Sequence, residues 1–221
     1  MRSTRAAEPL HLGTTDCDRS EHRVADLPTI ELTKIDVAEA HIRTAVRLFF
    51  EGCHSVPVYT PANAAREILT SIGEKTGIET VTNSLAKRKG VTHRSLVRDV
   101  KQDANYFKHA DRDARDVLRF NEGKVYGVLQ IACHDFGLIA GGMPIEAQIY
   151  EVWVTALAFR RISNAPLRKQ ELLRKCLQYF PGLRSADRAE QKRIGLRTMQ
   201  KCLTDPSLEM KFNRVVGSGV V

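Results

Sequence analysis

The sequence predicts an all-α protein, a helical bundle of about seven or eight helices. Apolar residues recur with helical spacing along most of the chain, and no alternating stretch is flanked by hairpin turn residues. Hydrophobic residues make up 43% of the 221 residues and charged residues 27%, which supplies enough apolar material for a core. The stretches between the helices are short, as in bundles. We expect the bundle core to span residues 29–160.

The first two helices are predicted from their starting residues. Thr33 followed by Asp36 matches a capping box, so a helix should begin there and end near Gly52. Thr60-Pro61 reads as an N-cap with proline at the first helical position, so a second helix should start there. Gly77 is expected to end it.

Two further helices follow. A short one covers residues 80–89 and stops at Gly90. Thr92 caps the next, which runs into the stretch NYFKHADRD at residues 105–113. The charged segment ADRDARDV, residues 110–117, is expected to be a loop.

The helix expected over residues 121–140 is apolar nearly all round, which is typical of a helix at the centre of a bundle. Gly141-Gly142 should end it, and Pro144 should begin the next helix, with Trp153 in the core. Cys133 and Cys176 also fall on apolar faces. His134-Asp135 is interpreted as a satisfied core pair, with a place in a site as the alternative.

The C-terminal quarter carries the positive charge. Residues 160–221 hold 14 Lys and Arg against 5 Asp and Glu, whereas residues 1–159 hold 20 against 21. Basic amphipathic helices are expected within residues 161–203, packed on or beside the core and split at Pro181-Gly182. Residues 1–28 read as a disordered arm and residues 204–221 as a tail.

Several classes of protein are not favoured by the sequence. No apolar run approaches the ~20 residues of a membrane span, and the N-terminal segment lacks the apolar core of a secretory signal. Five scattered cysteines without a Cys-x-x-Cys pair favour reduced thiols in the cytoplasm. No cofactor motif occurs, so we expect no cofactor. The lack of an apolar span predicts that the membrane is not a partner.

The helix that starts at Thr92 has one polar face without a carboxylate. On a helical wheel its residues are Arg94, Arg98, Gln102, Asn105 and His109, with Lys101 beside them. His109 is the natural general acid or base, and Asn105 can orient it or a substrate. Arg94 and Arg98 can hold a phosphate, and Asp111 can accept a His109 N–H bond or bind a metal. The alternative is a structural helix end followed by a solvated turn.

A metal or acid–base site is a further hypothesis. It requires His109 or Asp111 to come near His134 and Asp135, and sequence spacing does not decide whether they do.

The segments KIDVAEAHIRTAVRLFF, NAAREILTSI and NYFKHADRD resemble a family of uncharacterised bacterial helical proteins over residues 33–160. A more distant resemblance is to HEPN domains, helical bundles found in RNA-cleaving toxins. Their motif is commonly Arg-Asn-x-x-x-His; Asn105 and His109 match it, and Ala104 stands where the arginine belongs. The resemblance implies an RNA-directed function, a site around Asn105 and His109, and pairing into homodimers. Arg98 joins this candidate site because it shares their face on the helical wheel, two turns earlier, and not because it matches the motif.

The basic C-terminal residues suit contacts to phosphate backbone without base reading. They are Arg184, Arg188, Lys192, Arg193 and Arg197. Two hypotheses result. In the first, the protein acts on or binds RNA or another polyanion; in the second, it is a non-enzymatic helical interaction protein.

Overall fold

A computed structural model describes residues 29–109, 115–158 and 167–205. The chain divides into two units at Glu31 and Leu32, and all described helices belong to the second unit. The described residues form eight α-helices and no strand, which confirms the predicted all-α fold. The helices are α1 (Lys34–Phe50), α2 (Ser55–Thr76), α3 (Val81–Lys89), α4 (His93–Lys108), α5 (Gly123–Ala140), α6 (Ile145–Ala158), α7 (Leu167–Gln178) and α8 (Arg188–Leu203).

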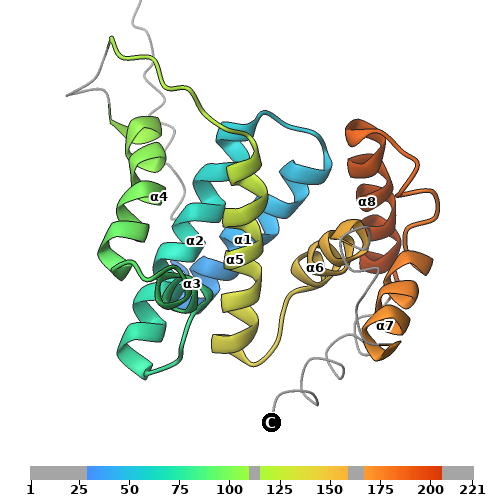
Figure 1. Cartoon of the computed structure of the whole chain (residues 1–221), viewed down its shortest axis with the longest axis horizontal. Helices are drawn as coiled ribbons and strands as arrows, with labels where there is room; N and C mark the ends of the chain where they lie inside the picture. Colours follow the sequence, from blue (N-terminus) through green and yellow to red (C-terminus); the bar gives the residue numbers. More distant parts are fainter. Residues whose placement is uncertain (1–28, 110–114, 159–166, 206–221) are drawn as a thin grey trace, which may run out of the picture. The chain divides into compact units, whose positions relative to one another are not determined.

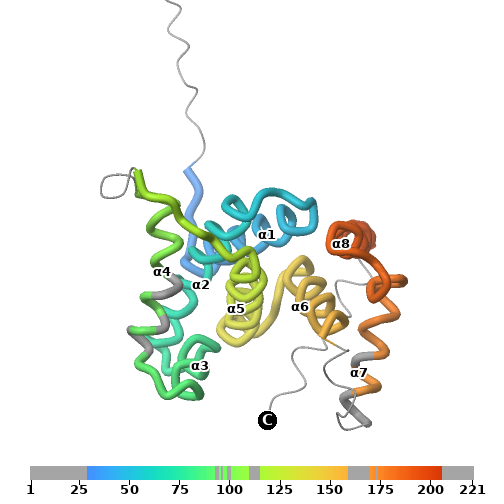
Figure 2. The backbone as a smooth tube through the Cα atoms, turned by 45° about the horizontal axis from the view of Figure 1, so that its top comes forward, coloured from blue at the N-terminus to red at the C-terminus, as the bar shows by residue number. Residues whose placement is uncertain are grey.

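Three helices form the centre of the second unit. α1, α2 and α5 pack against one another, with α3 and α4 on one side of them and α6, α7 and α8 on the other (Figure 1). Figure 2 shows the same order from a second direction. Helix α4 contacts α2 and α3, whereas α8 contacts α1 and α6. Helices α4 and α8, which both carry basic residues, therefore pack on different helices of the bundle.

The capping box predicted for α1 is present. The Thr33 hydroxyl accepts the Asp36 N–H at 3.2 Å, and the Asp36 carboxylate accepts the Thr33 N–H at 2.8 Å. The Asp36 carboxylate also accepts from the Thr33 hydroxyl at 2.7 Å, and this bond, together with the one from the Thr33 N–H, lowers the pKa of the Asp36 carboxyl. Helices α3 and α5 end at Gly90 and Gly141, both in the left-handed conformation that glycine adopts without strain.

The predicted start of α2 is wrong. The helix begins at Ser55, and its N-cap is His54, whose Nδ1 accepts the Val56 N–H at 3.3 Å. Pro61 lies inside the helix, and the Thr60 hydroxyl donates to the Val56 carbonyl at 3.0 Å instead of capping. Buried Val58 and Tyr59 hold this extra turn against the core. Tertiary packing thus overrides the boundary signal of the Thr-Pro pair.

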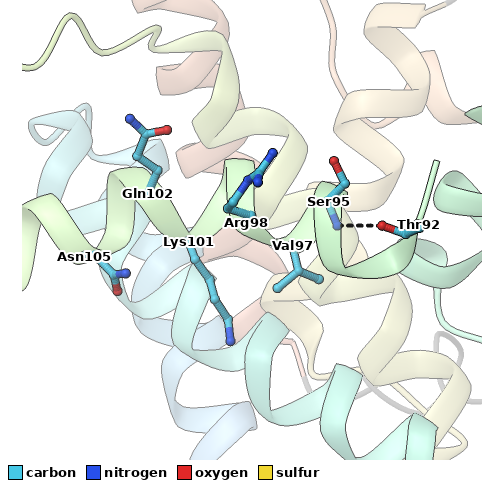
Figure 3. A pocket seen from close by; sticks show the side chains of 7 residues that line it. All are labelled: Thr92, Ser95, Val97, Arg98, Lys101, Gln102 and Asn105. Atoms are coloured by element: carbon cyan, nitrogen blue, oxygen red, sulfur yellow. Dashed lines mark hydrogen bonds between the residues drawn. The ribbon is translucent and has the colours of Figure 1, made fainter.

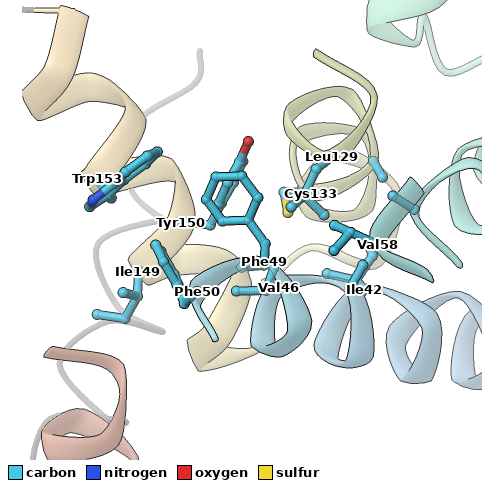
Figure 4. Close-up of a cluster of buried hydrophobic side chains, with 14 of the residues drawn as sticks. Ile42, Val46, Phe49, Phe50, Val58, Leu129, Cys133, Ile149, Tyr150 and Trp153 are labelled. Carbon is cyan, nitrogen blue, oxygen red and sulfur yellow. The ribbon is translucent and has the colours of Figure 1, made fainter. Parts of the chain in front are cut away.

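The core is richest in aromatic rings where α1, α5 and α6 meet (Figure 4). Phe49 makes edge-to-face contacts with Phe50, Tyr150 and Trp153, with ring centroids 5.3–5.5 Å apart. Trp153 is 1% exposed, and Cys133 and Cys176 are buried, as predicted. Helix α5 lies among the central helices, as predicted, but Gln130, His134 and Leu138 form an exposed stripe on it.

Helix α8 approaches α1 very closely. Gly195 is buried, and a Cβ atom at this position would overlap with the Phe50 ring. The Trp153 indole N–H donates to the Gln191 carbonyl at 3.0 Å, which ties α6 to the same part of α8. These contacts fix how α8 lies along the core.

One buried carboxylate links α1 to α6. Glu146 is fully buried, yet it accepts from Arg43 at 2.8 Å and from Arg47 at 2.6 Å. Both arginines are partly exposed, so their charges stay in contact with water while neutralising the glutamate. No described helix is both long and apolar enough to cross a membrane.

Candidate functional site

Helix α4 carries the candidate site and is fastened by its inner face. The Thr92 hydroxyl caps it by accepting the Ser95 N–H at 3.2 Å. Ala104 and Asp103 are buried, and Asp103 pairs with Lys124 of α5 at 2.6 Å. This ion pair was not predicted, because only the packing of α4 on its neighbours brings the two residues together.

The aromatic pair of the NYFKHADRD stretch is structural. Phe107 packs edge-on against Tyr59 and Phe120, with centroids 5.6 and 5.3 Å apart. The Tyr106 hydroxyl donates to the Asp116 carbonyl at 2.6 Å. These contacts anchor the C-terminal end of α4 and the segment after it. They account for Tyr106 and Phe107 without any catalytic role.

The outer face of α4 borders a hollow of about 920 Å³. Its described lining residues are Thr92, Ser95, Val97, Arg98, Lys101, Gln102 and Asn105. Figure 3 shows these side chains along one run of the helix. Arg98, Lys101, Gln102 and Asn105 are exposed, as the helical wheel predicts. The hollow therefore offers amides, hydroxyls and two cations.

The two cations on this face have no acidic partner among the side chains that the structure describes. Neither Arg98 nor Lys101 forms an ion pair or a side-chain hydrogen bond with any of them. None of the described lining residues is acidic. An unneutralised pair of cations over a concave surface raises the local concentration of anions. The face is thus electrostatically prepared for phosphate or carboxylate groups.

The helical wheel places His109 on the face of Asn105, but His109 lies one residue past the end of the helix. Helix α4 ends at Lys108, and His109 is its C-cap with extended backbone at φ −127° and ψ 123°. Its backbone N–H donates to the Asn105 carbonyl at 3.0 Å. Because the chain leaves the helix here, helical spacing no longer sets the direction of the His109 side chain. Asp111 and the side chain of Arg94 lie outside the described residues.

Ala104 faces the core and does not line the hollow. It is 2% exposed and belongs to the core cluster. In the HEPN motif this position carries an arginine. Here a larger charged side chain would have to enter the core of α2, α4 and α5. The departure from the motif is therefore built into the packing of α4.

His134 and Asp135 are not a core pair. Asp135 is fully buried and accepts the Val81 N–H at 2.7 Å, so it caps the start of α3, whereas His134 is exposed. Burial raises the pKa of the Asp135 carboxyl, and the Val81 hydrogen bond opposes that rise. No group of three or more His, Cys, Asp or Glu gathers in the described segments as a metal site.

The basic residues of the C-terminal part have diverse environments. Arg184 lies in the turn before α8, not on it. Arg193 and Arg197 both pair with Glu190, at 3.1 and 2.7 Å. The Lys192 ammonium lies over the Phe49 ring, 4.7 Å from its centroid. The basic residues predicted to contact phosphates therefore do not form one uniform surface. Arg193 and Arg197 are engaged by Glu190, and Lys192 is engaged by Phe49.

Arg66 and Glu151 are two further ionisable residues with little exposure that the sequence patterns do not single out. Arg66 is 1% exposed; it donates to Asn63 Oδ1 at 2.9 and 3.1 Å, and burial lowers its pKa. Glu151 of α6 has a buried Oε1 atom without a hydrogen-bond partner, and burial raises its pKa to about 7. The only signal for Arg66 is the helical spacing of Asn63 and Arg66, which is common on exposed faces too.

A scan against protein-family models, a search of curated proteins and a search of solved structures each found no significant match to this chain.

Proposed function

We propose that the outer face of α4 binds the phosphate backbone of RNA without cutting it. The observation that carries this proposal is that no described acidic side chain pairs with Arg98 or Lys101 at the rim of one hollow. Elsewhere, in α1 and α8, arginines are paired with glutamates. Cations that are left unpaired on a concave face are available to a ligand.

The residue types of this face suit phosphate contacts. The Arg98 guanidinium can bind two phosphate oxygens at once, and Lys101 supplies a mobile point charge. Gln102 and Asn105 add amide donors. The described lining holds no aromatic side chain on which bases could stack. We therefore expect binding that tolerates different sequences and depends steeply on salt.

Two features argue against cleavage. The arginine of the HEPN motif is replaced by Ala104, which is buried. His109 is the C-cap of α4 with extended backbone, so the helical register does not by itself hold it beside Asn105. A general acid or base must lie within hydrogen-bond reach of its substrate together with its partner groups. Binding alone is the function that this arrangement favours.

The test is the affinity of the protein for a fluorescent single-stranded RNA 20-mer across a salt series. Arg98→Ala with Lys101→Ala should weaken binding about tenfold, or ~1.4 kcal/mol. It should also lower the slope of log K against log salt by about 1.4, since each single-strand phosphate contact contributes ~0.7.

The matched control removes two other exposed cations, Lys175 and Arg197, each of which is paired with a glutamate. If this control weakens binding as much as the α4 variant, net charge and not the α4 face is responsible, and the proposal fails. RNA cleavage that disappears in His109→Ala would instead restore the enzymatic hypothesis.

A second candidate is the non-enzymatic interaction protein, including self-association into a homodimer. Leu172 and Tyr179, seven residues apart, are 58% and 46% exposed, as an apolar contact stripe would be. Light scattering tests it: self-association should be visible at micromolar concentration and should weaken in Leu172→Ser. A monomer at all concentrations would exclude the homodimer.

A further inference from the structure

A second cavity, of about 410 Å³, lies where α1 ends and α2, α5 and α8 begin. Three of its lining residues are cationic and come from the first two turns of α8: Arg188, Lys192 and Arg193. In the sequence, all three belong to a series of basic residues suited to phosphate contacts. The fold instead brings them to the wall of one compact cavity.

Lys192 is the central cation of this cavity. Its side chain is half-buried, and its ammonium lies 4.7 Å from the centroid of the Phe49 ring. It forms no ion pair in the described part of the chain. Burial lowers the pKa of Lys192, because the charged form has lost part of its hydration. An anion entering the cavity would replace that lost hydration.

The other wall of the cavity is acidic. Glu51 and Glu122 line it, and the Glu122 carboxylate accepts a hydrogen bond from the Ser55 hydroxyl at 3.0 Å. These two carboxylates would repel a continuous polyanion running through the cavity. They would accept hydrogen bonds from the hydroxyl or amino groups of a ligand whose single anionic group sits on α8. The cavity volume lies in the range of small-molecule sites.

We propose that this cavity binds a phosphate monoester, the terminal phosphate of a nucleotide. The phosphate contacts Lys192 and the guanidinium groups of Arg188 and Arg193, and the sugar hydroxyls face Glu51 and Glu122. A free mononucleotide and the 5′-phosphate end of an RNA present the same chemistry. Arg193 would then exchange part of its contact with Glu190 for the phosphate.

This inference does not rest on the proposed function of α4. The residues lining this cavity come from α1, α2, α5 and α8, and they share none with the hollow along α4. Variants of the two places can therefore fail separately. Loss of RNA backbone binding in an α4 variant would leave the phosphate monoester site unaffected.

The experiment is calorimetric titration of the full chain with AMP, with adenosine as the uncharged comparison. A second arm compares an RNA 8-mer that carries a 5′-phosphate with the same 8-mer ending in a hydroxyl. Lys192→Met removes the charge while keeping a long apolar stem against Phe49. Arg197→Gln is the control, since Arg197 is exposed on the same helix and does not line the cavity.

We expect AMP to bind and adenosine not to, and Lys192→Met to weaken AMP at least tenfold while Arg197→Gln does not. A preference for the 5′-phosphate RNA without AMP binding would identify the RNA end as the source. Equal binding of AMP and adenosine, or neither AMP binding nor a 5′-phosphate preference, would overturn the proposal. Circular dichroism melting of Lys192→Met shows whether the variant is folded, and Arg188→Gln provides a second test of the same wall.

Discussion

Helices α1 and α4 both present partly exposed cations, but the surroundings of these cations differ. Arg43 and Arg47 of α1 converge on the buried carboxylate of Glu146. Arg98 and Lys101 of α4 meet no acidic partner in the described segments. The first pair is needed to neutralise a charge inside the protein, and the second has no such task. The same residue types therefore serve the fold in one helix and remain available to a ligand in the other.

The largest expected effect comes from separating Glu146 from its arginines. Arg43→Met with Arg47→Met should lower the free energy of unfolding by about 3 kcal/mol, because a buried carboxylate is left unpaired. Arg98→Met with Lys101→Met should change it by less than ~0.5 kcal/mol. Urea denaturation of the two double variants measures both. Equal losses would mean that the α4 cations also stabilise the fold.

The next effect concerns Glu151, the other buried glutamate of α6. Its pKa in the folded state is raised to about 7 by burial, so the folded protein holds a proton that the unfolded chain releases at lower pH. Stability should therefore be full below the unfolded pKa and fall as pH rises through 7. Glu151→Gln should remove this loss and stabilise the protein by about 2 kcal/mol at pH 8, with little effect at pH 4.

Thermal melting of wild type and Glu151→Gln over this pH range measures the difference. Glu171→Gln is the control, since Glu171 is exposed and paired with Lys175. A difference that does not change with pH would show that Glu151 is not the titrating group.

A smaller effect is expected when α4 is given the acidic partner that it lacks. Gln102→Glu places a carboxylate one helical turn after Arg98 and next to Lys101. The RNA affinity should fall roughly threefold to tenfold, because the carboxylate neutralises Arg98 and repels phosphate. Gln130→Glu, on the exposed stripe of α5, adds the same charge elsewhere and should have less effect. Anisotropy titrations of both variants decide the comparison.

The smallest effect is expected at Glu190, which pairs with two exposed arginines of α8. Exposed ion pairs contribute little because water and salt screen them. Glu190→Ala should therefore move the melting midpoint by less than about 2 °C. Calorimetry at low and high salt would test it. A large loss at both salt concentrations would mean that Glu190 has a role in the fold beyond these pairs.

Much of the fold could be predicted because its signals are local. The capping box at Thr33 and the glycine at 90 act through hydrogen bonds and backbone conformation within a few residues. The apolar spacing of Trp153 and Cys133 also sufficed to place them in the core. These signals depend on the nearby sequence alone, and the all-α class follows from them.

The rest depends on contacts between distant residues. Pro61 lies inside α2 because Val58 and Tyr59 pack in the core one turn earlier. Asp135 became a cap for α3 through an N–H group 54 residues away in the chain. At the candidate site, helical spacing correctly predicted that Arg98 and Asn105 are exposed. The end of α4 was predicted within one residue, but His109 lies just past it, where helical spacing alone does not set the direction of a side chain.

The close packing of Gly195 against Phe50 has a consequence for how this sequence can change. In a library that randomises α8, every larger residue at position 195 should be depleted, whereas exposed positions such as 193 and 197 should accept many residues. Gly195 would then keep α8 packed on Phe50 while the exposed residues of the helix change. A chain of this fold could acquire a different ligand preference at α8 without first losing the helix from its place.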